Sequence, residues 1–315
     1  MSSTIVTVRN FERAESDRMF NDLQAVAGGT NCWFHLRKPT PIDAQTVIRM
    51  NRDTLYSIAV VDISEGAVVH VPDSGDRYLS VMVLDEDHFV HAVHHSPGDF
   101  EINVNDIGTP FAMIVARVLA DPTSAADLEA AHAIQDGLSV SAASTLPFEM
   151  PDYDKESFDA IRKAVLALGA GLDGLSGAFG ARGAVDPVMH LIGTAAGFGG
   201  LPNEEATYVV VEPPDPSKEY RVTLRDVPVD AFWSISVYNG DGFFEKNDHD
   251  VYSVNDLTAA KSDDGSITVH LGGAWDGAPN RIPTAAGWGM VVRLYRPRAE
   301  VLDGSWKFPR LEPVS

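Results

Sequence analysis

Cysteine is almost absent from this sequence of 315 residues. The single residue Cys32 has no second cysteine with which to form an internal disulfide, so the hydrophobic core must stabilise the fold. A chain of this length can bury such a core in one large or two ordinary domains. Because the absence of disulfides fits a reducing compartment, we expect the protein to be cytoplasmic.

Long apolar runs are also missing. No window of about 18 residues is both free of charge and dominated by apolar side chains, so we expect no membrane-spanning helix. The segment from Met1 to Asn10 lacks the apolar run of a signal peptide. We therefore expect no export.

Positive charge is scarce relative to negative charge. The 24 Lys and Arg residues face 45 Asp and Glu residues, and the formal net charge is −21. Such a chain repels phosphate backbones and anionic lipid head groups, so we expect neither nucleic acid nor a membrane surface as a partner. The expected partners are a small-molecule ligand or substrate and further copies of the chain in a homo-oligomer.

Motifs that bind nucleotides are lacking. The segment from Gly169 to Gly174 matches the letters of a dinucleotide fingerprint, but it follows a predicted helix where the fingerprint must follow a strand. We therefore expect no nucleotide cofactor.

Two regions of the sequence show the periodicity of β-strands. The first region holds short β-rich runs separated by turn residues, and the second contains a strand over Ala231–Tyr238 in which alternate residues face opposite sides. Closely spaced strands without a helix between each pair favour antiparallel sheets. The fold class is predicted as mainly β with a helical insertion, in two antiparallel β-sandwich or jelly-roll-like units.

A helical segment separates the two strand-rich regions. Ser124 and Asp127 form a capping box at the start of one helix, and Asp186 with Pro187 starts another. The predicted organisation is an N-terminal helix plus first β-sandwich over residues 1–120, a helical connection over 121–200 and a second β-sandwich over 201–315.

The densest group of chemically active side chains lies between Asp85 and His95. It holds three carboxylates and four of the ten histidines. On a strand His88 and His94 face one way while His91 and His95 face the other, so at most two act together. Partners for them, such as His35, Asp53 or His190, must come from elsewhere in the chain. The alternative interpretation is histidines hydrogen-bonded at a strand end or exposed on an acidic surface.

A second polar group runs from Asn51 to Ser57, directly before the apolar run that starts at Ile58. Arg52 and Asp53 need partners there, because an unpaired buried charge is costly. They either fix the start of the strand, or Arg52 holds an anionic ligand group while Asp53 and Tyr56 line the same cavity. Trp233 is a candidate cavity wall, although such aromatics are more often core.

Several of these segments together resemble a known family. The chain is similar to the tandem family of domain of unknown function 1254 followed by domain of unknown function 1214, and the resemblance spans nearly the whole chain. It implies two β-sandwich or jelly-roll-like units joined by helices, and it implies no activity. The segments that carry it are Asn51–Ser57, Arg77-Tyr78 with Asp85, Ala231–Tyr238, Asp264–Ser266, Arg293–Pro297 and Leu302–Trp306.

Three functions are compatible with these patterns. The first is a small-molecule enzyme, with a hydrolase favoured, in which Asp53, His88 and His95 supply acid/base chemistry on a carbonyl-bearing or acidic substrate between the two β units. A divalent metal ion held by His35, His88 and His95 is an option within it. The second is a non-catalytic binding protein for a small apolar or amphipathic ligand, and the third is a structural or assembly role.

Overall fold

The computed structural model describes residues 3–45, 48–172 and 174–314. The chain divides into two compact units that are discontinuous in sequence: unit 1 comprises Met1–Arg37 and Thr54–Asn203, and unit 2 comprises Lys38–Asp53 and Glu204–Ser315. The prediction of a mainly β protein with antiparallel sheets is confirmed. The predicted boundaries differ, because the helical segment belongs to unit 1 and a short piece of the first region belongs to unit 2.

Unit 1 is built on a five-stranded antiparallel sheet with the order β1-β2-β7-β4-β5. Its central strands are buried on both faces, which is why they read as almost continuous apolar runs. The strands are β1 (Trp33–His35), β2 (Thr54–Asp62), β4 (Leu79–Asp85), β5 (Val90–His94) and β7 (Phe111–Leu119).

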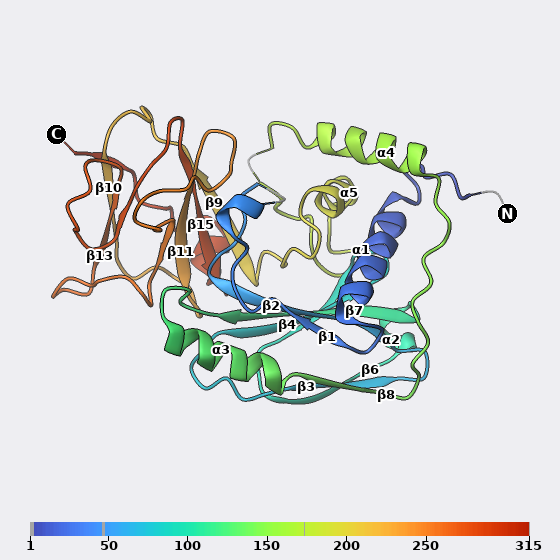
Figure 1. Ribbon diagram of the computed structural model, residues 1–315. Helices are drawn as coiled ribbons and strands as arrows, with labels where there is room; N and C mark the ends of the chain where they lie inside the picture. The colour runs from blue at the N-terminus through green and yellow to red at the C-terminus, as the bar shows by residue number, and fades with distance from the viewer. Residues whose placement is uncertain (1–2, 46–47, 173, 315) are drawn as a thin grey trace. The chain divides into compact units, whose positions relative to one another are not determined.

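Each face of this sheet is covered by a different layer (Figure 1). One face packs on a three-stranded sheet of β6, β3 and β8 and on α3, where the main core of the unit forms. The other face carries α1, which contacts β2 and packs with α4 and α5. These layers comprise β3 (Ala67–Val71), β6 (Gly98–Ile102), β8 (Ser139–Ala142), α1 (Phe11–Ala27), α2 (Val104–Ile107), α3 (Ala125–Gly137), α4 (Lys155–Leu168) and α5 (Pro187–Ala196).

The helix starts follow the capping chemistry that the sequence predicts. The Ser124 side chain accepts from the amide of Asp127 at α3, and the Asp186 side chain accepts from two amides at α5, directly before Pro187. α4 ends at Leu168, so a helix precedes Gly169 as predicted; the Gly169–Gly174 segment includes residue 173, which lies outside the described residues. No helix within the described ranges is long and apolar enough to cross a membrane.

Unit 2 contains two four-stranded sheets, in the orders β12-β11-β15-β9 and β14-β13-β10-β16. Alternate residues of β11, including Trp233, join those of β13 in one core cluster. The unit comprises a 3-10 turn (Ile42–Ala44), β9 (Ala206–Val211), β10 (Tyr220–Leu224), β11 (Trp233–Tyr238), β12 (Ser253–Asn255), β13 (Ile267–Leu271), β14 (Arg281–Ile282), β15 (Gly289–Tyr295), α6 (Ala299–Leu302) and β16 (Glu312–Pro313).

Candidate functional site

The face of β11 that points away from this core is polar. Ser234, Ser236 and Tyr238 alternate with the core residues, and Arg293 of β15 lies opposite Ser234 in the register. All four side chains are buried. Buried polar groups require partners, and here the partners come from the segment Lys38–Asp53, which belongs to the same unit.

Arg293 is the centre of this polar face, with only 3% of its surface exposed. Its guanidinium donates to Ser236 Oγ at 2.9 Å, to the hydroxyl of Tyr238 at 2.7 Å and to the carbonyl oxygens of Arg49 at 2.8 Å and Met50 at 3.1 Å. Burial alone would lower the pKa of Arg293, but the neighbouring tyrosines and Asp53 raise it above its ordinary value. The charge is therefore permanent and is shared among several acceptors.

Asp53 supplies the negative charge of the same network. It is 2% exposed, and Ser234 Oγ donates to its carboxylate at 2.5 Å. Burial raises the pKa of Asp53, while Arg293 and the Ser234 hydrogen bond oppose that shift. The preceding Asn51 accepts from the Asp53 amide at 2.7 Å and donates to the hydroxyl of Tyr295 at 3.0 Å.

Arg52 lies outside this network. Its guanidinium donates to the carbonyl oxygen of Thr40 at 2.9 Å and lies over the rings of Tyr252 at 5.3 Å and Phe244 at 5.9 Å. The Asn51–Asp53 motif thus anchors the end of the Lys38–Asp53 segment to the sheet. These contacts agree with the structural interpretation of the motif, in which its polar groups fix the start of the strand.

Two cavities in unit 2 border the turn that follows β11. The larger one has a volume of about 380 Å³ and lies beside the network, since Arg49 and Tyr238 belong to both. The apolar or aromatic part of its lining comes from Ile48, Val210, Pro213, Pro216, Tyr238, Trp288, Met290 and Val291. The charged residues that line it are Arg49, Glu212 and Asp241.

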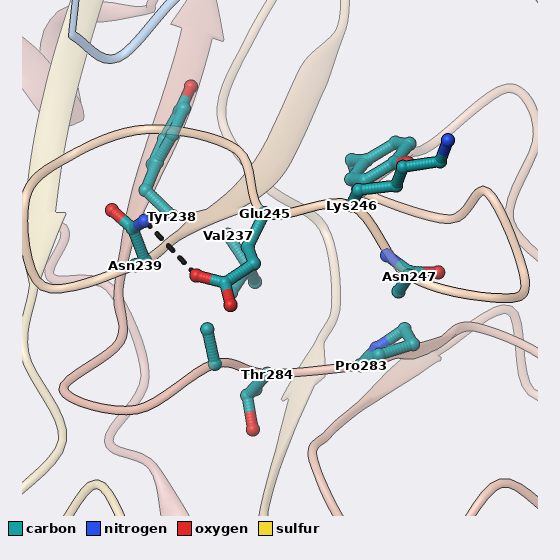
Figure 2. A pocket seen from close by; sticks show the side chains of 10 residues that line it. Val237, Tyr238, Asn239, Glu245, Lys246, Asn247, Pro283 and Thr284 are labelled. Atoms are coloured by element: carbon teal, nitrogen blue, oxygen red, sulfur yellow. Dashed lines mark hydrogen bonds between the residues drawn. The ribbon is translucent and has the colours of Figure 1, made fainter. Parts of the chain in front are cut away.

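The smaller cavity has a volume of about 120 Å³ and shares Tyr238 and Asn239 with the larger one. Figure 2 shows the Asn239 amide facing the carboxylate of Glu245, to which it donates at 3.1 Å. Thr284 lines the smaller cavity from a facing segment. Its size fits a few water molecules or a very small polar compound.

His88, a predicted catalytic residue, lies in unit 1 and not on a strand. The Asp85 carboxylate accepts from the amides of Asp87 and Phe89, and this turn gives His88 a φ of 67° before β5 begins at Val90. The alternation expected for a strand running from His88 is therefore wrong. Gly199 N donates to His88 Nε2 at 2.8 Å, so Nδ1 carries the hydrogen and donates to Thr194 Oγ1 at 2.9 Å.

The other predicted site residues have separate surroundings. In unit 1, His35 Nδ1 lies 2.8 Å from Ser57 Oγ and His95 Nδ1 lies 3.0 Å from the carbonyl oxygen of Leu79. Tyr56, also in unit 1, lies under the guanidinium of Arg117 at 5.2 Å. Trp233 packs in the core of unit 2, which explains why it does not line either cavity.

The predicted metal set is not assembled. Across residues 3–45, 48–172 and 174–314, no group of three or more His, Cys, Asp or Glu side chains is arranged to hold a metal ion. His35, His88 and His95 each bond a different partner within unit 1. The described structure therefore does not bring the three histidines of this optional metal site together.

Sequence reasoning missed the residues that complete the network. Strand alternation predicts that Ser234 and Ser236 share a face, and Arg293 belongs to a segment of the family resemblance, but neither observation assigns these residues to a site. Two serines on the alternate face of an otherwise apolar strand, together with one arginine inside the last strand, indicate a buried polar cluster.

Comparison with protein-family models gives two matches in this chain. Residues 30–101 match Protein of unknown function (DUF1254), and residues 211–299 match Protein of unknown function (DUF1214). A search of curated proteins finds no match.

Two solved structures are similar in fold. The VPA0106 protein from Vibrio parahaemolyticus is 16% identical, with a TM-score of 0.72 and coverage of 98% of both chains. A putative uncharacterized protein from Burkholderia cenocepacia is 14% identical, with a TM-score of 0.53 over 96% of this chain and 87% of that chain.

Fold and site together define a β-rich protein of two units, the second of which is braced by a buried arginine network. Within that class, the chain belongs to the tandem family in which DUF1254 is followed by DUF1214. The network joins the two matched regions, because Asp53 lies in the first match and Ser234 and Arg293 lie in the second.

Proposed function

We propose that this protein binds a small amphipathic molecule in the larger cavity of unit 2. The observation that carries the proposal is the cavity itself, whose volume of about 380 Å³ lies within the range of small-molecule sites. Its apolar lining suits a hydrocarbon or aromatic body. The charged side chains of Arg49, Glu212 and Asp241 suit a polar end.

The cavity wall is held in place by the buried network. Arg49 has a φ of 55°, which is costly for a residue other than glycine, and it is fixed at both backbone ends. Its amide donates to the carbonyl oxygen of Gly242 at 2.8 Å, and its own carbonyl accepts from Arg293 at 2.8 Å. A wall fixed before the ligand arrives lowers the entropy cost of binding.

Tyr238 gives a second fixed wall. Its hydroxyl donates to the carbonyl oxygen of Met50 at 2.8 Å and accepts from Arg293, so its ring is held beside the cavity. These contacts support a shaping role for the family-motif residues Tyr238 and Arg293. In this proposal they hold the cavity wall in place, and the charge of Arg293 does not contact the ligand.

A cavity-filling variant tests the proposal. Gly289 lines the cavity opposite Tyr238, and a Cβ there would meet its nearest atom, the carbonyl oxygen of Val211, at an ordinary 3.6 Å. We expect Gly289→Leu to fold and to bind the neutral dye N-phenyl-1-naphthylamine at least tenfold more weakly than the unaltered protein, because the added side chain occupies the cavity. Fluorescence titration measures this.

The matched control adds a leucine elsewhere in unit 2. Thr223 is exposed on β10, away from both cavities, so Thr223→Leu should keep the dye affinity. Equal binding by Gly289→Leu and the unaltered protein, or no binding by either, would refute the proposal.

Hydrolysis at Asp53, His88 and His95 is less well supported by these contacts. Asp53 accepts from Ser234, and the charge of Arg293 acts on the same carboxylate, while both ring nitrogens of His88 are bonded within unit 1. The bonds that these groups already make compete with the activation of water. Turnover of an ester and amide panel that disappears in His88→Ala would favour the enzyme over the binding protein.

A further inference from the structure

Trp288 is a buried tryptophan that lines the larger cavity of unit 2 directly before β15 begins. It is only 1% exposed, and its indole Nε1 is hidden from solvent. Among the residues that the structure describes, none accepts a hydrogen bond from this nitrogen. An indole N–H can only donate, and a buried donor without an acceptor is costly, so its place beside a cavity requires an explanation.

The neighbours of Trp288 fix the position of its ring. The ring of Tyr220 packs against it in a T-shaped arrangement with centroids 6.2 Å apart, and the Tyr220 hydroxyl accepts from the Asp215 amide at 3.1 Å. Gly287, directly before the tryptophan, has a φ of 65°, a conformation that favours glycine. Because Trp288 is also part of the core of unit 2, the indole cannot turn towards another acceptor without disturbing that core.

The other donors beside the cavity are already used. Of the buried side chains that line it in the described chain, only Tyr238 and Trp288 carry a polar hydrogen. The Tyr238 hydroxyl donates to the carbonyl oxygen of Met50 at 2.8 Å. The half-buried Asn239 donates through its amide to Glu245 at 3.1 Å. The indole hydrogen of Trp288 is thus the buried donor that is available to a ligand.

The charged residues of the lining lie on its exposed side. Arg49, Glu212 and Asp241 are all exposed, so a charged group of a ligand would stay close to solvent. The lining, as far as the structure describes it, contains no buried charge. A carboxylate placed against one indole N–H would lose its hydration without gaining a counter-charge, whereas a neutral carbonyl oxygen is satisfied by one donor.

We propose that Trp288 donates its indole hydrogen to a neutral carbonyl oxygen of the ligand, such as that of a ketone, an ester or an amide. This inference rests on the binding function proposed above and narrows the ligand to a carbonyl compound with an apolar body. The carbonyl oxygen lies at the buried end of the cavity, and the apolar body packs on lining side chains such as Tyr238 and Met290. The bond gives Trp288 the acceptor that the described chain does not supply.

A matched pair of neutral probes tests the inference. The ketone 2-acetylnaphthalene carries a carbonyl oxygen where the hydrocarbon 2-isopropenylnaphthalene carries a methylene group of similar shape. The hydrocarbon leaves water more readily, so the informative quantity is the ratio of the two dissociation constants, each measured by displacement of N-phenyl-1-naphthylamine. We expect Trp288→Phe to weaken binding of the ketone relative to the hydrocarbon by about tenfold, because phenylalanine has no hydrogen to donate.

Trp306→Phe is the control for this substitution. Trp306 packs against the same core but lines neither cavity, so its variant should keep the ratio of the unaltered protein. An unchanged ratio in Trp288→Phe, with both probes bound, would overturn the role of Trp288 and leave the binding function intact. Failure of both probes to bind the unaltered protein would overturn the binding function and this inference together.

The indole proton of Trp288 gives a second readout, in the unaltered protein. Both probes carry the same naphthalene ring, so any ring-current shift is common to them. In the proton–nitrogen spectrum we expect the ketone to move the Trp288 indole proton further downfield than the hydrocarbon does, because only the ketone accepts its hydrogen bond. Equal responses to the two probes would overturn the inference, since a water molecule would then be the acceptor. If Trp288→Phe fails to fold, this spectrum decides.

Discussion

Buried charge explains why the polar residues of unit 2 occur where they do. An arginine in a sheet is stable only when its donors have acceptors, and Arg293 donates to one serine side chain, one tyrosine side chain and two main-chain carbonyls. From the sequence one can predict that Asp53 needs a partner. One cannot predict that Ser234 is the partner, because they are brought together by the tertiary fold across 181 positions of sequence.

The first prediction concerns the arginine of this network. Arg293→Met leaves the Asp53 carboxylate buried with its main counter-charge removed, and we expect unit 2 to lose about 3–5 kcal/mol of unfolding free energy. Denaturant unfolding measures the loss. Arg298→Met is the control, because Arg298 forms an exposed pair with Asp230 and should leave the midpoint nearly unchanged. Equal midpoints for the two variants would contradict the role assigned to Arg293.

The second prediction concerns two buried carboxyls of unit 1. Burial raises the pKa of Asp17, which accepts from the Tyr153 hydroxyl at 2.7 Å, to about 6, and burial likewise raises the pKa of Glu86 to about 6. A raised folded-state pKa gives stability that is fully present below the ordinary value near about 4 and is lost as pH rises through about 6. Unfolding free energy should therefore fall between about pH 4 and pH 6.

A substitution at Asp17 isolates the contribution of this residue to the pH dependence of the unfolding free energy. Asp17→Asn keeps the shape of the side chain and removes its titration, so it should flatten the pH dependence and raise stability at pH 7. Asp22→Asn, at an exposed position on the same helix, should keep the slope. An unchanged slope in Asp17→Asn would show that the burial of this carboxyl is not linked to folding.

At the scale of elements, the sequence predicts where strands and helices lie better than it predicts which distant segments they contact. The β-rich runs predicted for the first region include the observed strands β3 (Ala67–Val71) and β7 (Phe111–Leu119), because period-two alternation and apolar runs are local signals. The Lys38–Asp53 segment had no such signal. Its structure comes from side-chain bonds to distant main chain, which no local pattern records.

The third prediction concerns a glutamine that fastens this segment. Gln45 donates to the carbonyl oxygen of Phe244 at 2.9 Å and accepts from its amide at 2.9 Å. Removing both bonds in Gln45→Ala should cost about 1–3 kcal/mol locally and speed hydrogen exchange at the Phe244 amide about tenfold or more.

Unit 1 offers a matched control for that experiment. Gln24 makes the same pair of bonds with the main chain of Phe148. Gln24→Ala should speed exchange at Phe148 and leave Phe244 unaffected. Exchange at Phe244 that does not change in Gln45→Ala would mean that the glutamine does not fasten the segment.

At the scale of the whole molecule, the two units are discontinuous in sequence. The sequence predicts a division near residue 200, and strand-rich regions do lie on either side of it. The Lys38–Asp53 segment is nevertheless part of unit 2, although it lies within the DUF1254 match. Patterns of apolar residues locate cores, but they do not reveal that a segment crosses from one unit to the other.

The fourth prediction follows from this arrangement. A fragment of residues 204–315 lacks the carbonyl oxygens of Arg49 and Met50 that accept from Arg293, and it lacks Asp53. We expect this fragment to be largely unfolded by circular dichroism, and a synthetic peptide of residues 38–53 to restore part of its structure. Cooperative unfolding of the fragment alone would contradict the bracing role of the segment.

Ligand binding in unit 2 can be observed without choosing a probe. Native mass spectrometry of the freshly isolated, full-length chain should detect a species heavier than the protein alone by the mass of one small molecule. Gly289→Leu, purified in the same way, should lack it. A bound molecule that persists in Gly289→Leu, or its absence from the unaltered protein, would contradict the proposal that this cavity is the binding site.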